Sequence, residues 1–253
     1  DGAGHTITAA DPVGDHFRGG VVESGGAVAH VRMVTIAAGG LENACDAGDD
    51  RLRGILFEGA SGSIMHVTVD GLNQGASGCQ EGNAIEVRNI GHVEGRPEVS
   101  VKHNIVRDYQ KTGIVANGEI DVDVSHNTIG ASSTQANLAA NTIQIGFGAS
   151  GRVALNDLEG NQWLGASNYA ATAILLYDSG VGLDIHKNVI TGNSDIGIYV
   201  YANEVTVSNN EVHDQGPDGG HYDIGIGNWG ENNVFRNNTV SGFDTPTDGV
   251  ETT

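Results

Sequence analysis

The amino-acid sequence predicts an all-β solenoid, a stack of similar coils built from short strands, and three observations support this. A Gly/Ala/Thr-Ile pair recurs along the chain, a strand-like segment ending in Asn follows most copies of it, and apolar and polar residues alternate in both. Successive pairs lie 30, 29, 29, 31, 24 and 28 residues apart. A repeat of nearly constant length with variable loops indicates one supersecondary unit per turn.

The first repeated element is the strand that opens with this pair. It occurs at Gly54-Ile55, Ala84-Ile85, Gly113-Ile114, Thr142-Ile143, Ala173-Ile174, Gly197-Ile198 and Gly225-Ile226. In the copy Gly-Ile-Tyr-Val-Tyr, Ile198 and Val200 share one face and Tyr199 and Tyr201 the other, because neighbouring side chains in a strand alternate. We expect the Ile face to form the core and the other face to point outward.

The second repeated element ends in Asn. The six clear copies end at Asn104, Asn127, Asn156, Asn188, Asn210 and Asn238, and we expect Asp70 and Val34 in the same slot of two earlier copies. Asn is a poor strand former, so its recurrence needs a cause. An Asn side chain satisfies backbone groups at a tight corner, and stacked copies can hydrogen bond to one another. The sequence therefore predicts an internal amide ladder.

Composition favours one elongated domain over residues 1–253, with coils clearest over 20–243. Gly is abundant at 39, Pro is rare at 4 and aromatic residues make up only 5%, which suits thin, tightly turned coils. The segment Asp1-Gly-Ala-Gly-His-Thr-Ile-Thr is typical of the middle of a coil. We therefore expect a fragment or a trimmed mature chain.

The formal net charge is −20. A surface this acidic repels nucleic acid and anionic membranes, and it accommodates divalent cations such as Ca²⁺ or reflects a high-salt habitat. No hydrophobic run reaches membrane-spanning length, so membrane insertion is not expected. The pair Cys45 and Cys79 lies in loops before consecutive coils and predicts a disulfide and a secreted or cell-surface protein; two free thiols in a cytosolic protein are the alternative.

Asn-punctuated coils of three short strands resemble the right-handed parallel β-helix of the pectate-lyase-like superfamily, which includes many polysaccharide lyases, hydrolases and epimerases. The resemblance implies a single β-helix of about eight coils with the Asn ladder between the second and third sheets. It also implies that the Gly-Ile strands form the first sheet, whose outer face carries the substrate cleft. Catalytic signatures are missing: Gly48-Asp49-Asp50 matches polygalacturonases, but no Gly-His-Gly follows one coil later, and no pectate-lyase Arg-x-Pro-x-x-Arg is present.

Outward positions of the first sheet supply the candidate substrate-binding residues. An exposed aromatic group suits the apolar faces of sugars, although a covering loop or a further domain is an alternative explanation. We expect the cleft to contain Tyr177, Tyr199, Tyr201 and Trp229, together with Glu86, Asn117 and Gln144.

Two acidic residues beside the aromatic group, Asp195 and Asp223, occupy equivalent positions in neighbouring coils, about 5 Å apart. They fit a Ca²⁺ site together with Asp218, a glycosidase acid and nucleophile, or simple acidic turns. For an elimination reaction, Lys111 or Arg88 would neutralise charge or act as base, and the loop before Asp223 supplies His221.

The outer face of the second sheet carries mixed charges, among them Lys102, Asp123 and Arg152, which we interpret as surface ion pairs. Zinc is not expected there, because His103 and His126 stack without a third imidazole or thiol.

The sequence thus predicts an extracellular carbohydrate-active enzyme, a polysaccharide lyase or glycoside hydrolase, with a polysaccharide or oligosaccharide as its partner. The alternative is a non-catalytic glycan-binding, adhesin-like or structural module of a larger surface protein. Neither end shows an amphipathic helix to cap the core, so capping by another domain or chain is expected.

Overall fold

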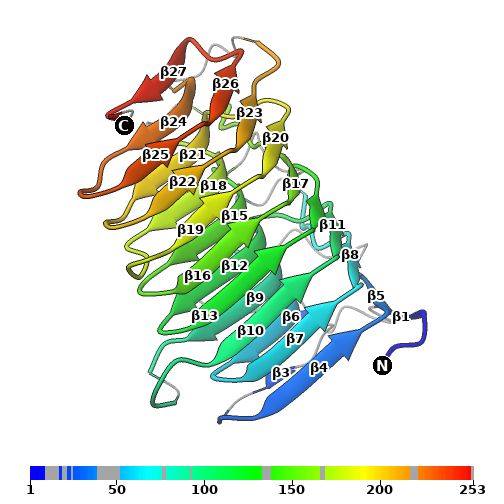
Figure 1. Ribbon diagram of the computed structural model, residues 1–253. Coiled ribbons are helices and arrows are strands. Elements are labelled where there is room, and N and C mark those ends of the chain that lie inside the picture. Colours follow the sequence, from blue (N-terminus) through cyan, green and yellow to red (C-terminus); the bar gives the residue numbers. More distant parts are fainter. Residues whose placement is uncertain are drawn as a thin grey trace.

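The computed structural model contains three parallel sheets wound around one apolar core (Figure 1). It describes residues 1–8, 17–18, 22–23, 25–38, 52–75, 78–91, 93–132, 138–165, 169–216 and 222–251. These residues form strands, turns and loops and contain no helix, which confirms the predicted all-β class. Consequently, no helix of this part of the chain is long and apolar enough to cross a membrane.

The strands fall into three sheets, each listed here in chain order. The first sheet comprises β2 (Phe17–Arg18), β3 (Val22–Glu23), β6 (Leu52–Glu58), β9 (Asn83–Asn89), β12 (Thr112–Gly118), β15 (Asn141–Gly146), β18 (Thr172–Tyr177), β21 (Ile196–Tyr201), β24 (Ile224–Asn228) and β27 (Thr245–Asp248). The second comprises β4 (Val28–Arg32), β7 (Ser61–Met65), β10 (Glu98–Lys102), β13 (Asp121–Ser125), β16 (Ser150–Ala154), β19 (Asp184–His186), β22 (Thr206–Ser208) and β25 (Val234–Arg236). The third comprises β1 (His5–Thr8), β5 (Val34–Ala37), β8 (Thr68–Asp70), β11 (Ile105–Arg107), β14 (Thr128–Ile129), β17 (Asp157–Glu159), β20 (Val189–Thr191), β23 (Glu211–His213) and β26 (Thr239–Ser241).

Each coil runs through the first, second and third sheets in turn, and strands that pair are one coil apart. The two ends of the chain lie at opposite ends of the stack (Figure 1). Within the described ranges the second sheet has eight strands, which agrees with the predicted number of coils, and the parallel pairing confirms the predicted β-helix.

The Ile of each repeated pair faces the core, as the alternation predicted. Ile55, Ile85, Ile114, Ile143, Ile174, Ile198 and Ile226 are in register along the first sheet and at most 1% exposed. Full burial of one such side chain stabilises the fold by about 1.5–3 kcal/mol. The residue before it is small because the next coil is close: a Cβ added to Gly197 would lie 2.6 Å from the carbonyl oxygen of Gly225.

The predicted amide ladder is present at the turn between the second and third sheets. Asn104, Asn127, Asn156, Asn188 and Asn210 each donate a side-chain N–H to the amide oxygen of the next Asn at 2.9–3.0 Å. The residue before each of the six Asn has a positive φ, between 52° and 58°. The ladder therefore holds a sharp corner that the backbone disfavours for residues other than Gly.

The ladder slot is filled differently in the two earlier coils. Ile105 and Thr35 both pair with Thr68, so Val67 and Val34 occupy the slot. The prediction for Val34 is confirmed and that for Asp70 is wrong. Asp70 ends β8 and forms an ion pair with Arg107 at 2.8 Å. Val67 retains the hydrogen-bond pattern through its backbone, because its N–H donates to the side-chain oxygen of Asn104 at 2.9 Å.

Candidate functional site

The outward rows of the first sheet match the predicted register. Leu175 pairs with Tyr199 and Tyr199 with Gly227, while Tyr177 pairs with Tyr201. Successive strands of a sheet lie about 4.8 Å apart, so these side chains form continuous rows along the helix axis. Over β18, β21 and β24 the rows are dominated by aromatic rings.

Five rings form what we call the aromatic strip: Phe147, Tyr177, Tyr199, Tyr201 and Trp229. Ring centroids are 5.6 Å apart between Phe147 and Tyr177, and 5.2 Å between Tyr177 and Tyr201. The indole of Trp229 stacks on Tyr199 at 4.5 Å. Four of the rings are at least 40% exposed, and Tyr199 is half-buried.

Two local features position the strip. Gly227 lies under the indole of Trp229, where a Cβ would come within 2.2 Å of the ring, so a side chain there would displace it. Phe147 was not predicted, because it follows the row position held by Gly146. Its φ of 55° turns the chain at that point and places its ring beside Tyr177. The sequence signal was a bulky residue directly after a Gly in the outward row.

A pocket of about 470 Å³ lies on the same face, between the loops before β15 and β18. The predicted candidate Lys111 lines it together with Asn141, Trp163, Tyr169 and Leu175. The ammonium of Lys111 donates to the carbonyl oxygen of Ala139 at 2.5 Å. Burial lowers the pKa of Lys111 from 10.5 to about 8, because the charged form is poorly solvated there. Lys111 can thus exchange a proton near neutral pH.

The pocket around Lys111, which we call the lysine pocket, is continuous with the aromatic strip. Leu175 lines the pocket and is the neighbour of Tyr199 in the outward row. Thr112 follows Lys111 and lies in β12. Four successive strand pairings lead from Thr112 across the sheet to Ile224, by way of Asn141, Thr172 and Ile196. At about 4.8 Å per step, the face from the pocket to the strand before Trp229 is roughly 19 Å long.

The predicted residues of the N-terminal coils lie in a buried ion-pair network. Glu86 is 3% exposed and pairs with Arg53, which also contacts Glu81 at 2.5 Å. Arg88 pairs with Glu58 at 2.8 Å and with Glu86 at 3.3 Å. These contacts join β6 and β9 rather than forming an open cleft. Functional roles for Glu86 and Arg88 stay predictions.

The amides of the remaining two predicted substrate-binding residues lie nearer the strip. The amide of Gln144 donates to the side-chain oxygen of Asn117 at 3.2 Å, and both are partly exposed. Gln144 precedes Leu175 in the outward row, so this amide pair lies at the edge of the lysine pocket.

The two carboxylates predicted to act together, Asp195 and Asp223, are in register but make their hydrogen bonds in opposite directions. Asp195 is 1% exposed, and its Oδ2 accepts from the backbone N–H groups of Trp163 and Ala171, both in the preceding coil. The Oδ2 of Asp223 accepts from the N–H of Asp244 in the following coil. Burial, opposed by this hydrogen bond, raises the pKa of Asp223.

Several predictions fall on residues that lie outside the described part of the chain: His221, Asp218 and Cys45. Among the described residues, no three His, Cys, Asp or Glu side chains converge on a position for a metal ion. Cys79 is buried, with 1% of its surface exposed. The calcium site and the Cys45–Cys79 disulfide therefore stay predictions.

The second sheet carries the expected ion pairs, since Asp123 contacts Lys102 at 2.6 Å and Arg152 at 2.7 Å. The prediction that no third imidazole joins His103 and His126 is wrong. His66 stacks on His103 with a centroid distance of 5.1 Å, and His103 lies 4.9 Å from His126. It was missed because the coil of His66 has Val67 in place of the ladder Asn. The stacked rings do not converge on a metal position among the described residues.

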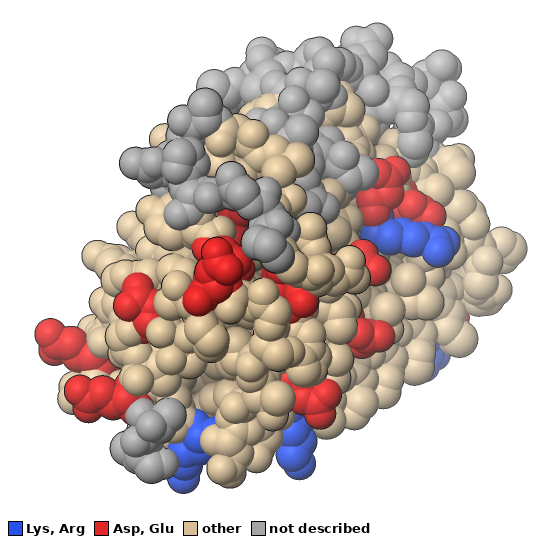
Figure 2. All heavy atoms as spheres, turned by 90° about the horizontal axis from the view of Figure 1, so that it is seen from above, with Lys and Arg blue, Asp and Glu red and all other residues tan. Residues whose placement is uncertain are grey.

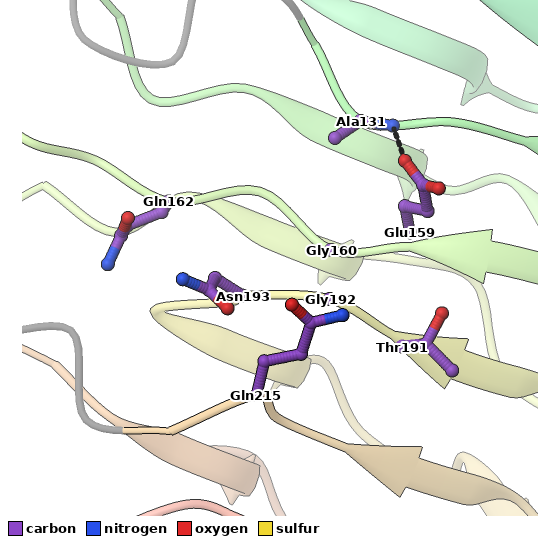
Figure 3. A pocket seen from close by; sticks show the side chains of 8 residues that line it. All are labelled: Ala131, Glu159, Gly160, Gln162, Thr191, Gly192, Asn193 and Gln215. Carbon is purple, nitrogen blue, oxygen red and sulfur yellow. Dashed lines mark hydrogen bonds between the residues drawn. The ribbon is translucent and has the colours of Figure 1, made fainter.

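A polar hollow of about 400 Å³ lies where the third sheet ends, beyond β17 and β20 (Figure 3). Figure 3 shows the side chains of Gln162, Asn193 and Gln215 around it. Glu159 accepts a hydrogen bond from the N–H of Ala131 at 3.1 Å on one side of the hollow. Its lining residues are not those of the aromatic strip, so it is a separate feature.

Three parallel sheets, an internal Asn ladder and an outward face of aromatic rings define a right-handed parallel β-helix, a fold compatible with proteins that act on or bind polysaccharides. Comparison with protein families agrees: the family described as "Right handed beta helix region" matches residues 53–240. The chain belongs to this family. No curated protein and no solved structure matched it.

Proposed function

We propose that this protein is a secreted or cell-surface carbohydrate-active enzyme that binds a polysaccharide along the outer face of the first sheet. The observation that carries this proposal is the aromatic strip, which leads directly into the lysine pocket. Exposed contiguous rings mark binding surfaces, and flat rings suit the apolar faces of sugars. The length of the face, about 19 Å, suits a polymer rather than one sugar.

Lys111 is the group we propose for proton transfer. With a pKa of about 8, a useful fraction of its side chain is the free amine near neutral pH. The free amine accepts a proton from the substrate, whereas the ammonium stabilises a developing negative charge. Asn141 lines the same pocket and can hydrogen bond to sugar hydroxyl groups. Asp195 is a poor candidate for this step, because one of its oxygens already accepts from two backbone N–H groups.

The test is a screen of uronate-containing, amino-sugar and neutral polysaccharides with wild type, Lys111→Met and Trp229→Ala. Product is followed by ultraviolet absorbance of unsaturated ends and by release of reducing ends. We expect Lys111→Met to abolish turnover but retain binding, and Trp229→Ala to weaken binding. Turnover that survives Lys111→Met would refute the role of Lys111, and full affinity in Trp229→Ala would refute the location of the glycan. An EDTA arm tests the predicted calcium.

A non-catalytic glycan-binding module is the second candidate. It is favoured by the composition of the lysine pocket, whose described lining residues include no carboxylate to share the proton transfer. This candidate predicts affinity that depends on Trp229 and Tyr201, with no product in either assay. Product formation in any arm would exclude it.

A further inference from the structure

A third pocket, of about 450 Å³, lies at the corner where the chain leaves the first sheet for the second. We call it the corner pocket. Tyr201 and Trp229 of the aromatic strip line one part of it, and the turns after β18 and β24 contribute Asp178, Ser179 and Glu231. The strip therefore ends in this pocket, on the side of the first sheet away from Lys111.

The corner pocket is acidic. Neither the carboxylate of Asp178 nor that of Glu231 has a side-chain ion pair or hydrogen bond within the described part of the chain, and both residues are exposed. No Lys or Arg is among the described residues that line the pocket. The hydroxyl oxygen of Ser179 is buried and has no hydrogen-bond partner among them. Two exposed carboxylates without an ion pair thus line the same pocket as two aromatic rings.

This combination selects the charge of its ligand. Carboxylates attract cations and repel uronates, and the faces of Tyr and Trp rings attract ammonium groups within about 6 Å. The net charge of −20 acts in the same direction over longer distances. Figure 2 shows acidic side chains spread over the face seen from above, with Lys and Arg on its right side and along its lower edge.

We propose that the polysaccharide carries free amino groups, and that the corner pocket binds the ammonium group of an amino-sugar unit. Asp178 and Glu231 pair with the ammonium, and Tyr201 and Trp229 contact the sugar. The inference rests on the proposed position of the glycan on the first sheet, but it does not depend on catalysis. Elimination needs a uronate, so a polymer made only of amino sugars would release reducing ends without ultraviolet absorbance.

The experiment compares chain-length-matched oligomers of glucosamine, N-acetylglucosamine and galacturonate, with binding followed by tryptophan fluorescence and calorimetry. The variant is Asp178→Asn combined with Glu231→Gln. The matched control is Glu204→Gln, an exposed carboxylate on a neighbouring turn that is not among the residues lining the pocket. Circular dichroism confirms that each variant is folded.

We expect the glucosamine oligomer to bind on the order of tenfold more tightly than its N-acetylated counterpart, with the difference shrinking as salt is raised. The double substitution should remove this preference and leave N-acetylglucosamine binding unchanged, and Glu204→Gln should change neither. Equal affinity for the two oligomers, a preference for galacturonate, or a preference that survives the double substitution would each overturn the inference. If this inference fails but the neutral oligomer still binds in a way that depends on Trp229, the proposed glycan-binding function stands. If no oligomer binds, both the inference and the proposed function are refuted.

Discussion

Replacement of Asn156 by Ala tests whether the amide ladder stabilises the coils. The side chain is 2% exposed and makes four hydrogen bonds. Its oxygen accepts from the backbone N–H and the side-chain N–H of Asn127, both at 2.9 Å. Its N–H groups donate to the carbonyl oxygen of Val124 at 3.0 Å and the amide oxygen of Asn188 at 2.9 Å. Alanine removes all four.

The magnitude follows from the groups left behind. The backbone N–H of Asn127 loses its acceptor in a buried corner. The side chain of Asn127 keeps its hydrogen bond to the carbonyl oxygen of Val101. The amide oxygen of Asn188 still accepts a hydrogen bond from the backbone N–H of residue 156. One unsatisfied buried donor costs about 1–3 kcal/mol, and the other lost bonds add to this. We therefore expect Asn156→Ala to lower the free energy of unfolding by about 2–4 kcal/mol.

The control is Asn238→Ala, at the C-terminal end of the ladder. Asn238 is only partly buried, and its side chain contacts Asn210 and Val207 without a further rung in the described coils. Water can replace its bonds, so we expect a loss of about 1 kcal/mol. Both values come from urea unfolding followed by far-ultraviolet circular dichroism. Equal losses in the two variants would refute the argument, because Asn156 is more deeply buried and makes one more ladder bond than Asn238.

Three further predictions concern titratable groups. Asp195→Ala should lower the free energy of unfolding by about 2–4 kcal/mol in thermal or urea denaturation, because the buried N–H groups of Trp163 and Ala171 lose an acceptor; a neutral effect would contradict the structural role. Partial desolvation between two stacked imidazoles, together with the charges of His126, His66 and Lys102, lowers the pKa of the exposed His103 from 6.5. The unfolded chain therefore binds this proton more readily, so the melting temperature should fall as pH drops through 6.5, and His103→Gln should flatten the fall. If Lys111 acts as a free amine, the rate should rise with pH through about 8, and a rate that falls there would assign the role to the ammonium.

The sequence predicted the register of the fold because its signal is local. A small residue before Ile, and an Asn that ends the next strand 12 to 19 residues later, mark the same two positions in each coil. The same reasoning placed Asp70 wrongly, because that coil has Val67 in the ladder slot and the pattern was read three residues late. If Val67 had been assigned to the ladder slot, the sequence would also have predicted that His66 stacks with His103.

The candidate site was predicted only in part, because exposure depends on loops that the repeat does not encode. Glu86 points outward as the alternation requires, yet it is 3% exposed within ion pairs. Asp195 occupies its predicted place beside Asp223, but its hydrogen bonds to the preceding loop could not be inferred from spacing. The aromatic residues were easier to place, because four rings in two outward rows need only the register.

The spacing of the strip also limits how a sugar can bind to it. The rings contact one another in two groups, Phe147–Tyr177–Tyr201 and Tyr199–Trp229. Within each group the centroids of neighbouring rings are 4.5–5.6 Å apart, close to the spacing of the strands, so no pyranose fits between rings that contact each other. Tyr177 has a tilted contact with Phe147 on one side and stacks on Tyr201 on the other, whereas Tyr201 and Trp229 each stack on one ring and also line the corner pocket. We therefore expect Tyr201→Ala and Trp229→Ala to weaken glycan binding by about tenfold each, the value of one good ring contact. Tyr177→Ala should weaken it less in the same fluorescence titration, and an equal or larger effect would show that the sugar lies across the middle of the strip instead.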